Sequence, residues 1–493
     1  MSHNTNPLEA ELPPLGEAGP HRKRLGLISI VACLGGLLFG YDTGVANGAE
    51  GPMAQDLGLD LLQLGLVISI LSFAAGVGAF LGGKLSDAVG RRRAIIVLAV
   101  LFFGGTLLVI FSPGGGGEFN AFGFATLLAG RITLGLAVGG ASSVVPVYLA
   151  ELAPYEIRGS ITGRNELAIV SGQLAAFVVN AAIANTLGEE GGVWRFMFAV
   201  CALPAVFLFF GMLRMPESPR WLVEHGRFDE AHRVLESVRS RSRADAEFTQ
   251  VEQIANEERE AKIGFGALFS NKWLVRIVAV AAGLSMIQQL TGINSIMYFG
   301  SRVLEEAGMT PEQAVLANIS FGVVAVLGGI FALRNMDRIN RRTTFLIGLS
   351  LTTTFHVLVA IAANVFPEGH PARAVVILVL VVGFVLSMQS FLNIAVWVWL
   401  AEIFPLHMRG LGFGIAAFFG WTMGGVLALF VPTLIDWSLT GTFVVFAAIG
   451  VVAILYVWRL VPETRGRTLE ALEDDVTTGA IHTITKSQQT HAE

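Results

Sequence analysis

About twelve long apolar runs constrain the fold of this chain more than any other feature. Each run holds roughly 20 residues, the length that an α-helix needs to cross the hydrocarbon core of a bilayer. Only helices or closed barrels satisfy their backbone hydrogen bonds in lipid, and runs of this length indicate helices. The predicted spans are 25–47, 62–83, 94–112, 122–150, 161–187, 194–214, 273–300, 313–334, 343–365, 373–402, 410–435 and 440–461. We therefore expect an all-α membrane protein.

Composition supports this expectation and excludes several classes of protein. Of the 493 residues, 53% are hydrophobic and 14% are charged, whereas soluble domains carry about 25% charged residues. No nucleophile–base pair or metal-ligand spacing occurs, so we expect no enzyme, no metal and no cofactor. The absence of a basic patch with interleaved aromatic residues argues against a nucleic-acid partner. Cys33 and Cys201 stand alone in separate apolar runs, which favours packing roles.

Two charged motifs occur twice, once in each half of the chain. The first comprises Leu149-Ala150-Glu151, Pro154, Arg158 and Gly159, and it returns as Leu400-Ala401-Glu402, Pro405, Arg409 and Gly410. The second, Asp87-Ala88-Val89-Gly90-Arg91-Arg92, returns as Asp337-Arg338-Ile339-Asn340-Arg341-Arg342. Because both return after nearly the same interval, we infer two structurally equivalent halves. In an apolar chain such a duplication is typical of transporters whose substrate site lies between the halves.

A polar segment separates two groups of six spans. Between Glu217 and Lys262, apolar residues recur at the spacing of short amphipathic helices lying on the membrane surface. The residues after Asp475 lack such periodicity, so we expect that end to be disordered. The predicted regions are a tail over 1–24, a six-helix bundle over 25–214, a cytoplasmic helical linker over 215–272, a second six-helix bundle over 273–461 and a tail over 462–493.

Basic residues predict the orientation of the spans. Lysine and arginine fall in alternate loops and termini, for example at 22–24, 91–93 and 341–342, whereas loops 48–61, 113–121, 188–193 and 436–439 contain none. Arg302 and Arg373, at the edges of other outer loops, are exceptions. Positive residues accumulate on the cytoplasmic side of a membrane. We therefore expect a multi-pass protein of the cell membrane with both termini and the linker in the cytoplasm.

Two ionisable residues lie within predicted spans, where a charge is costly and is therefore a functional candidate. Asp42 lies about 17 residues into the first span and Arg131 about nine residues from the outer end of the fourth, so at 1.5 Å per residue both fall in the outer half. A carboxylate beside a guanidinium forms an ion pair that protonation breaks. Asp42 and Arg131 therefore predict proton coupling. The alternative is a fixed ion pair that only holds two helices together.

Acidic and basic residues recur at the cytoplasmic ends of equivalent spans. Breaking several partly exposed pairs, each worth under about 1 kcal/mol, would make a reversible gate. The alternative is that the basic residues only anchor the topology, although anchoring does not require acids at repeating positions. The predicted cytoplasmic gate comprises Asp87, Arg91, Glu151, Arg158, Glu217, Asp337, Arg341, Glu402, Arg409 and Glu463.

Uncharged polar residues within the spans predict a substrate site. Amide side chains both donate and accept hydrogen bonds, which suits a neutral polyhydroxylated ring, and indole faces stack on its C–H surface. The alternative role is hydrogen bonding between helices, worth about 0.6 kcal/mol per contact in membranes. The candidates are Gln288, Gln289, Asn294 and Tyr298 around Gly292, Glu166 and Gln173 on the fifth span, and Trp397, Trp399 and Trp421 on the tenth and eleventh.

Several motifs resemble those of the sugar porters of the major facilitator superfamily. They are Gly40-Tyr41-Asp42, the 87–92 string, Arg131, Pro216-Glu217-Ser218-Pro219-Arg220-Trp221-Leu222, Gln288-Gln289-Leu290-Thr291-Gly292-Ile293-Asn294 and Pro462-Glu463-Thr464-Arg465-Gly466. The resemblance implies two six-helix bundles, alternating access and proton symport, with Asp42 protonated beside Arg131. It implies that substrate is bound by Gln173, Gln288, Gln289, Asn294 and Trp397, with Phe39 and Tyr298 lining or gating the site.

Three departures from the sugar-porter pattern bear on function. Glu166 stands where many members have glutamine, Asn393-Ile394 replaces a Gly-Pro pair before Trp397, and Asn340 replaces a loop glycine. The string from Asn165 to Gln173 resembles that of bacterial myo-inositol transporters. We therefore predict a secondary transporter, working as a monomer, that imports a polyol or monosaccharide, foremost myo-inositol, together with protons. A hexose or pentose symporter, a facilitator and a transporter-like nutrient receptor are the alternatives.

Overall fold

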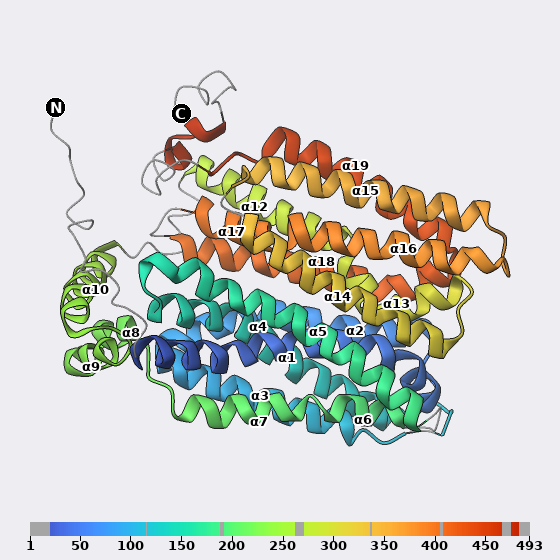
Figure 1. The fold of residues 1–493 in the computed structure, drawn as a ribbon, viewed down its shortest axis with the longest axis horizontal. Helices are drawn as coiled ribbons and strands as arrows, with labels where there is room; N and C mark the ends of the chain where they lie inside the picture. The colour runs from blue at the N-terminus through green and yellow to red at the C-terminus, as the bar shows by residue number, and fades with distance from the viewer. Residues whose placement is uncertain are drawn as a thin grey trace.

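The computed structural model describes residues 20–114, 116–187, 192–261, 271–335, 338–404, 408–465 and 475–482. Across these ranges, twelve helical segments are long and apolar enough to cross a membrane, which confirms the predicted all-α membrane fold. Figure 1 shows them as one elongated array, with the blue-to-green half of the chain beside the yellow-to-red half. Three short linker helices lie at one end of the array.

The N-terminal half holds the first six spans. Its helices are α1 (Pro20–Leu57), α2 (Leu61–Val89), α3 (Arg91–Ile110), α4 (Ala121–Leu152), α5 (Arg158–Leu187), α6 (Val193–Ala199) and α7 (Ala202–Leu213), the last two forming the sixth span. The linker follows as α8 (Pro219–Glu224), α9 (Phe228–Val238) and α10 (Arg241–Ala261). These helices match the amphipathic segment predicted between Glu217 and Lys262.

The C-terminal half holds the other six spans. Two of them are interrupted: the seventh consists of α12 (Lys272–Leu290) and α13 (Ile293–Glu306), and the tenth of α16 (Pro371–Met388), the π-helical turn η3 (Gln389–Asn393) and α17 (Ile394–Ile403). The remaining spans are α14 (Pro311–Asn335), α15 (Arg341–Val365), α18 (Arg409–Trp437) and α19 (Leu439–Leu460).

Two predicted boundaries differ from the structure. The first span was expected to end at residue 47, yet α1 continues to Leu57 because its polar residues Asn47 and Glu50 are buried against other helices rather than exposed. The end of the chain was expected to be disordered, but Val476 and Ile481 are buried. The Asn271 amide also donates to the carbonyl of Thr477 at 2.9 Å.

Glycine lets helices within the first half approach closely. A Cβ at Gly40 of α1 would lie 1.8 Å from the carbonyl oxygen of Ile169 on α5. A Cβ at Gly139 of α4 would lie 1.9 Å from the carbonyl oxygen of Ala75 on α2. Any larger side chain would force these helix pairs apart, which is the packing role expected of small residues in membrane helices.

Gly292 breaks the seventh span at the level of the predicted substrate residues. Its φ of 83° is left-handed, a conformation that glycine adopts without steric cost. The ring of Phe446 lies 3.0 Å from where a Cβ would stand. The break separates α12, which carries Gln288 and Gln289, from α13, which carries Asn294.

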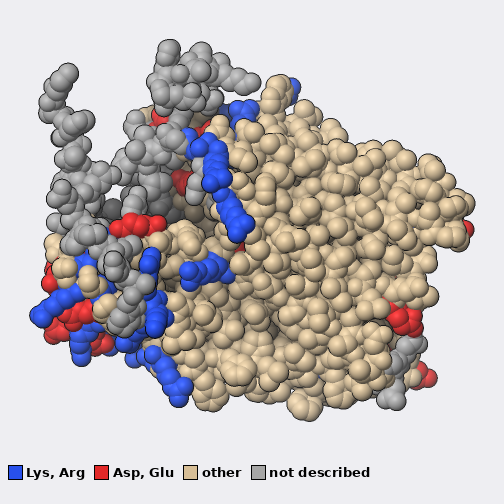
Figure 2. All heavy atoms as spheres, in the orientation of Figure 1, with Lys and Arg blue, Asp and Glu red and all other residues tan. Residues whose placement is uncertain are grey.

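The two ends of the helix array differ in charge. We call the end that carries α8–α10 the linker end and the opposite one the distal end. Figure 2 shows lysine, arginine, aspartate and glutamate gathered at the linker end, while the flank facing the viewer is almost free of charge. An uncharged flank between polar ends is what a membrane-spanning array requires.

Candidate functional site

Asp42 and Arg131 form a fully buried ion pair. The Arg131 Nη1 lies 2.9 Å from Asp42 Oδ1 and donates to both carboxylate oxygens. Both side chains are 0% exposed, and the Arg131 Nε donates to the carbonyl of Val67 at 3.2 Å. The guanidinium also lies 5.7 Å from the ring centre of Phe198. Arg131 therefore ties α4 to α1 and α2, which confirms that Asp42 and Arg131 pair.

The amides around Gly292 form a hydrogen-bonded cluster. The Asn294 amide donates to Gln289 Oε1 at 2.7 Å across the helix break. The Gln288 amide donates to the main-chain oxygen and to Oδ1 of Asn393, on the tenth span, at 3.4 and 3.3 Å. Gln288 Oε1 is buried without a hydrogen-bond partner. The structure thus brings three predicted residues together and adds Asn393, which the sequence analysis noted only as a departure from the family pattern.

Aromatic candidates connect the two halves. The ring centres of Phe39 on α1 and Trp421 on α18 lie 5.3 Å apart. Trp397, on the tenth span, packs against Phe413 of α18 at 5.7 Å. Trp399, by contrast, is fully buried and donates its indole N–H to the carbonyl of Pro462 at 3.0 Å. Trp399 therefore has a structural contact, whereas Phe39 and Trp421 meet at the interface between the halves.

Three other candidates are not bonded to the amide cluster. Gln173 on α5 is 5% exposed and its Oε1 has no hydrogen-bond partner. Tyr298 on α13 is 1% exposed, and its hydroxyl also lacks one. Glu166 lies on α5 two helical turns from Gln173, toward the linker end, and is partly buried. Unpaired buried oxygens are costly, so the Gln173 amide oxygen has free hydrogen-bonding capacity for a ligand.

Asn47 joins the halves at the distal end. Its amide donates to the carbonyls of Ile296 and Met297 at 3.3 and 3.0 Å, and its Oδ1 accepts from the backbone N–H of Ser301 at 2.8 Å. The Asn318 amide also donates to Asn47 Oδ1, at 3.1 Å. The sequence analysis assigned no role to Asn47. The signal was present, since polar residues in apolar spans are functional candidates.

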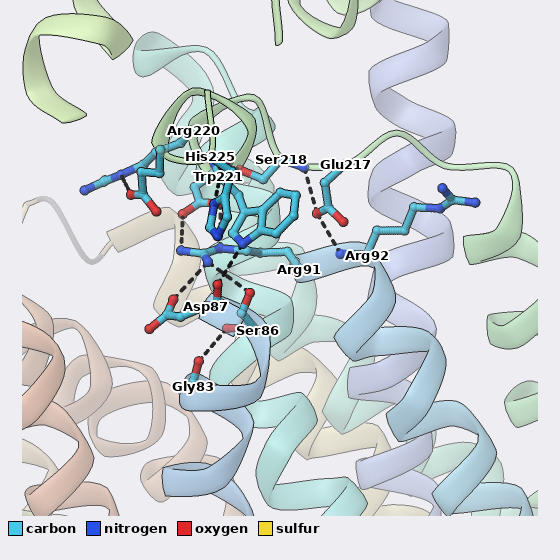
Figure 3. Close-up of polar contacts among 12 residues, drawn as sticks. Gly83, Ser86, Asp87, Arg91, Arg92, Glu217, Ser218, Arg220, Trp221 and His225 are labelled. Atoms are coloured by element: carbon cyan, nitrogen blue, oxygen red, sulfur yellow. Dashed lines mark hydrogen bonds and ion pairs between the residues drawn. The ribbon is translucent and has the colours of Figure 1, made fainter. Parts of the chain in front are cut away.

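At the linker end, the predicted gate residues of the first half form one cluster. Arg91 contacts Glu151 at 3.1 Å. It also contacts Asp87 at 2.9 Å (Figure 3). Glu217 accepts from the backbone N–H of Arg92 at 2.9 Å, so its carboxylate caps the first turn of α3. A negative group is favourable there because helix N-termini carry unpaired N–H groups. Arg158 is exposed.

The second half repeats this arrangement. Arg341 lies 3.0 Å from Glu402, and Glu463 accepts from the backbone N–H groups of Arg341 and Arg342, both at 2.9 Å. Asp337 and the side chain of Arg409 lie outside the described residues. The matched geometry supports two equivalent halves. Asn47 makes four hydrogen bonds between the halves, and these lie toward the distal end.

The linker helices bind the first half. The Trp221 indole of α8 donates to the carbonyl of Asp87 at 2.8 Å (Figure 3), and Arg239 donates to the carbonyl of Leu152 at 2.9 Å. Burial lowers the pKa of the Arg239 guanidinium, and Glu247 at 3.0 Å opposes that shift. These hydrogen bonds attach the linker to the N-terminal half.

A small pocket lies at the linker end of the second half. Asn335, Arg341, Thr344 and Ser390 contribute its polar lining. Of the predicted residues, only the gate residue Arg341 lines it, and none of the substrate candidates does. Its Arg341 is already paired with Glu402, so the pocket is not the predicted substrate site.

Comparison with known proteins decides the family. A family model described as "Sugar (and other) transporter" matches residues 28–475. The chain belongs to the sugar transporter family. It is therefore a multi-pass membrane transporter, and the prediction that it is not an enzyme is confirmed.

Two curated relatives cover nearly the whole chain. The major myo-inositol transporter IolT of Bacillus subtilis is 42% identical over 464 residues, which is 94% of this chain and 96% of IolT. The putative metabolite transport protein YncC of the same organism is 44% identical over 458 residues, or 92% of this chain and 95% of YncC.

Solved structures agree with this assignment. A partially occluded inward-open conformation of the xylose transporter XylE from E. coli has a TM-score of 0.79 at 27% identity, covering 90% of this chain and all of XylE. The proton:xylose symporter XylE bound to 6-bromo-6-deoxy-D-glucose has a TM-score of 0.76 at 29% identity, covering 91% of this chain and 98% of that one. The major facilitator fold is therefore confirmed.

Replacing Asn47 with alanine should open the distal end. The change removes four hydrogen bonds between the halves, each worth about 1 kcal/mol. Spin labels at Glu118→Cys and Glu368→Cys, in a background without Cys33 and Cys201, should report longer distances across the distal end. Asn185→Ala is the matched control, because its amide donates within its own helix to Ala181. An unchanged distance distribution in Asn47→Ala would contradict this role.

Proposed function

We propose that the protein imports a polyol or monosaccharide, foremost myo-inositol, by proton symport and alternating access. The observation that carries the proposal is a fully buried Asp42–Arg131 pair in a chain that also holds a cluster of amides at the break of the seventh span. The 42% identity to a myo-inositol transporter supports the choice of substrate, and the likeness to a proton:xylose symporter supports the coupling ion.

Proton coupling follows from the burial of this ion pair. With Asp42 ionised, the carboxylate and the guanidinium neutralise each other and hold α1 against α4. Protonation removes one charge and leaves Arg131 buried without its counter-ion, which is strongly unfavourable. Asn47 lies five residues further along α1, or about 7.5 Å at 1.5 Å per residue. The same helix thus carries the proton-binding group and the bonds that close the distal end.

The substrate site combines amides, aromatic faces and one acid. The proposed substrate-binding residues are Phe39, Glu166, Gln173, Gln288, Gln289, Asn294, Tyr298, Trp397 and Trp421. Free oxygens on Gln173 and Gln288 would accept hydrogen bonds from ring hydroxyls. The contact between Phe39 and Trp421 places aromatic faces where the halves meet. Glu166 gives this site an acidic side chain. A negative charge there would repel an anionic sugar, so the site favours a neutral polyol as substrate.

The charged clusters at the linker end supply the proposed cytoplasmic gate. Each half holds its own arginine–glutamate pair, and Arg158 is exposed. We propose that closure of the linker end brings these clusters together, so that charges from both halves share partners. In this proposal, the gate is open in the conformation whose distal end is joined through Asn47.

Charge distribution supports a cytoplasmic linker end. The arginines of the distal end lie beside acids: Arg195 contacts Asp56, Arg302 lies 3.8 Å from Asp436, and Arg373 lies 4.0 Å from Glu368. The linker end nevertheless holds far more lysine and arginine residues than the distal end, which predicts that the linker end and both termini face the cytoplasm of a cell-membrane protein. The site lies between two halves of one chain, which supports function as a monomer.

An uptake panel tests the proposed substrate. Purified protein in liposomes is offered myo-inositol, glucose, fructose and xylose, with and without an imposed proton gradient. We expect gradient-driven accumulation of myo-inositol. Hexose uptake without inositol uptake would contradict the inositol assignment, and equal uptake without a gradient would identify a facilitator. Binding without flux would identify a receptor.

Asp42→Asn should abolish accumulation while retaining exchange. The variant cannot release a proton, so the gradient no longer drives uptake and the internal substrate concentration should not exceed the external one. Counterflow between two pools of substrate should persist, since the substrate residues remain. Continued accumulation against a gradient in Asp42→Asn would show that Asp42 and Arg131 form only a structural ion pair.

Neutralising the gate should slow uptake. In Glu151→Gln combined with Glu402→Gln, the closed linker end loses two charge contacts between the halves of about 1 kcal/mol each, so its population should fall roughly thirtyfold. Uphill uptake should slow accordingly, while substrate affinity in detergent stays within about twofold. Asp229→Asn, an exposed acid on the linker, is the control. Wild-type uptake rates in the double variant would favour a purely topological role for these charges.

A further inference from the structure

The tenth span contains a π-helical turn where sugar porters have a Gly-Pro pair. This turn, Gln389–Asn393, separates α16 from α17, and its last residue is the asparagine that stands in the glycine position. A π-turn inserts one extra residue into the helix, and such turns are frequent at functional sites. The chain therefore interrupts the tenth helix without proline and gains a side chain at the point of interruption.

The Asn393 side chain lies against the predicted substrate site. Its Oδ1 accepts from the Gln288 amide at 3.3 Å, and its main-chain oxygen accepts from the same nitrogen at 3.4 Å. Both distances exceed the usual 2.9–3.0 Å for N–H···O bonds, so Gln288 is held loosely. Gln288 is 3% exposed, whereas Asn393 is partly exposed.

Unused hydrogen-bonding capacity remains on both side chains. Gln288 Oε1 is buried without a partner, and Asn393 Nδ2 makes no hydrogen bond to the described residues. An acceptor and a donor on two contacting side chains match a hydroxyl group, which donates one hydrogen bond and accepts others. A glycine at position 393 would supply neither the donor nor the contact to Gln288.

We propose that Asn393 is a substrate-contacting residue that selects for one hydroxyl of the ring. Gln288 Oε1 accepts a hydrogen bond from that hydroxyl, and Asn393 Nδ2 donates one to its oxygen. Trp397 follows four residues further along the tenth span, about one helical turn away. The assignment depends on the proposed function, because it names a specificity-determining residue within that site.

Deoxy analogues test the role of Asn393. Uptake of the best substrate from the panel is competed with each of its monodeoxy analogues, in wild type and in Asn393→Ala. A site built to hydrogen-bond a hydroxyl discriminates against the analogue that lacks it, so in wild type one analogue should bind about tenfold more weakly. In Asn393→Ala this preference should fall to about twofold or less, while the ratios for the other analogues stay unchanged.

Two further variants separate recognition from folding. Asn393→Asp keeps the size of the side chain and the acceptor for Gln288 but removes the donor, so it should lose the same discrimination. Gln288→Ala should affect the same hydroxyl, and the double variant should add little, as expected of residues that act on one group. Asn335→Ala is the control, because its amide donates to Phe331 within α14.

The outcomes distinguish this assignment from the proposed function. Unchanged analogue ratios in Asn393→Ala and Asn393→Asp, with wild-type uptake intact, would overturn the role of Asn393 alone. A uniform loss of affinity for every analogue would also overturn it, since that pattern indicates a structural contribution. Absence of uptake of any panel sugar by wild type would overturn the proposed function and this inference with it.

Discussion

The buried pair of Asp42 and Arg131 is the interaction on which the rest of the first half depends. It places a positive charge where no water is available to solvate it, and only the carboxylate on α1 compensates that charge. Around the pair, α1 is fixed by glycine contacts to α5 and by Asn47 to α13. A change of charge at one carboxyl group therefore acts on a helix that touches both halves of the molecule.

Some features of the structure occur in both halves, and others occur in one half alone. The arginine–glutamate pairs and the glutamate caps of α3 and α15 repeat in the two halves with nearly the same geometry. The buried ion pair occurs in the first half, and the amide cluster around Gly292 in the second. The repeated contacts at the linker end suit a rocking motion of the two halves. The residues proposed to bind the substrate and the proton are not repeated between the halves.

Much of this arrangement could be predicted from the sequence. Apolar runs located all twelve spans, because a helix in lipid must be apolar over a fixed length. Depth along the helices indicated that Asp42 and Arg131 could pair. The distal part of α1 and the contact between Gln288 and Asn393 could not be predicted, since they depend on how distant segments meet. Hydropathy ends the first span at Asn47, whose polar side chain is satisfied only by residues about 250 positions away.

The attachment of the linker has a further consequence. Trp221 of α8 is bonded to the end of α2, Arg239 after α9 to the end of α4, and Arg243 of α10 to Glu156 just beyond α4. A molecule that binds these helices from the aqueous side therefore acts directly on the first bundle. A ligand bound to the linker would thus shift the equilibrium between conformations without contacting the substrate site. A binder raised against it would act on turnover without competing with the sugar.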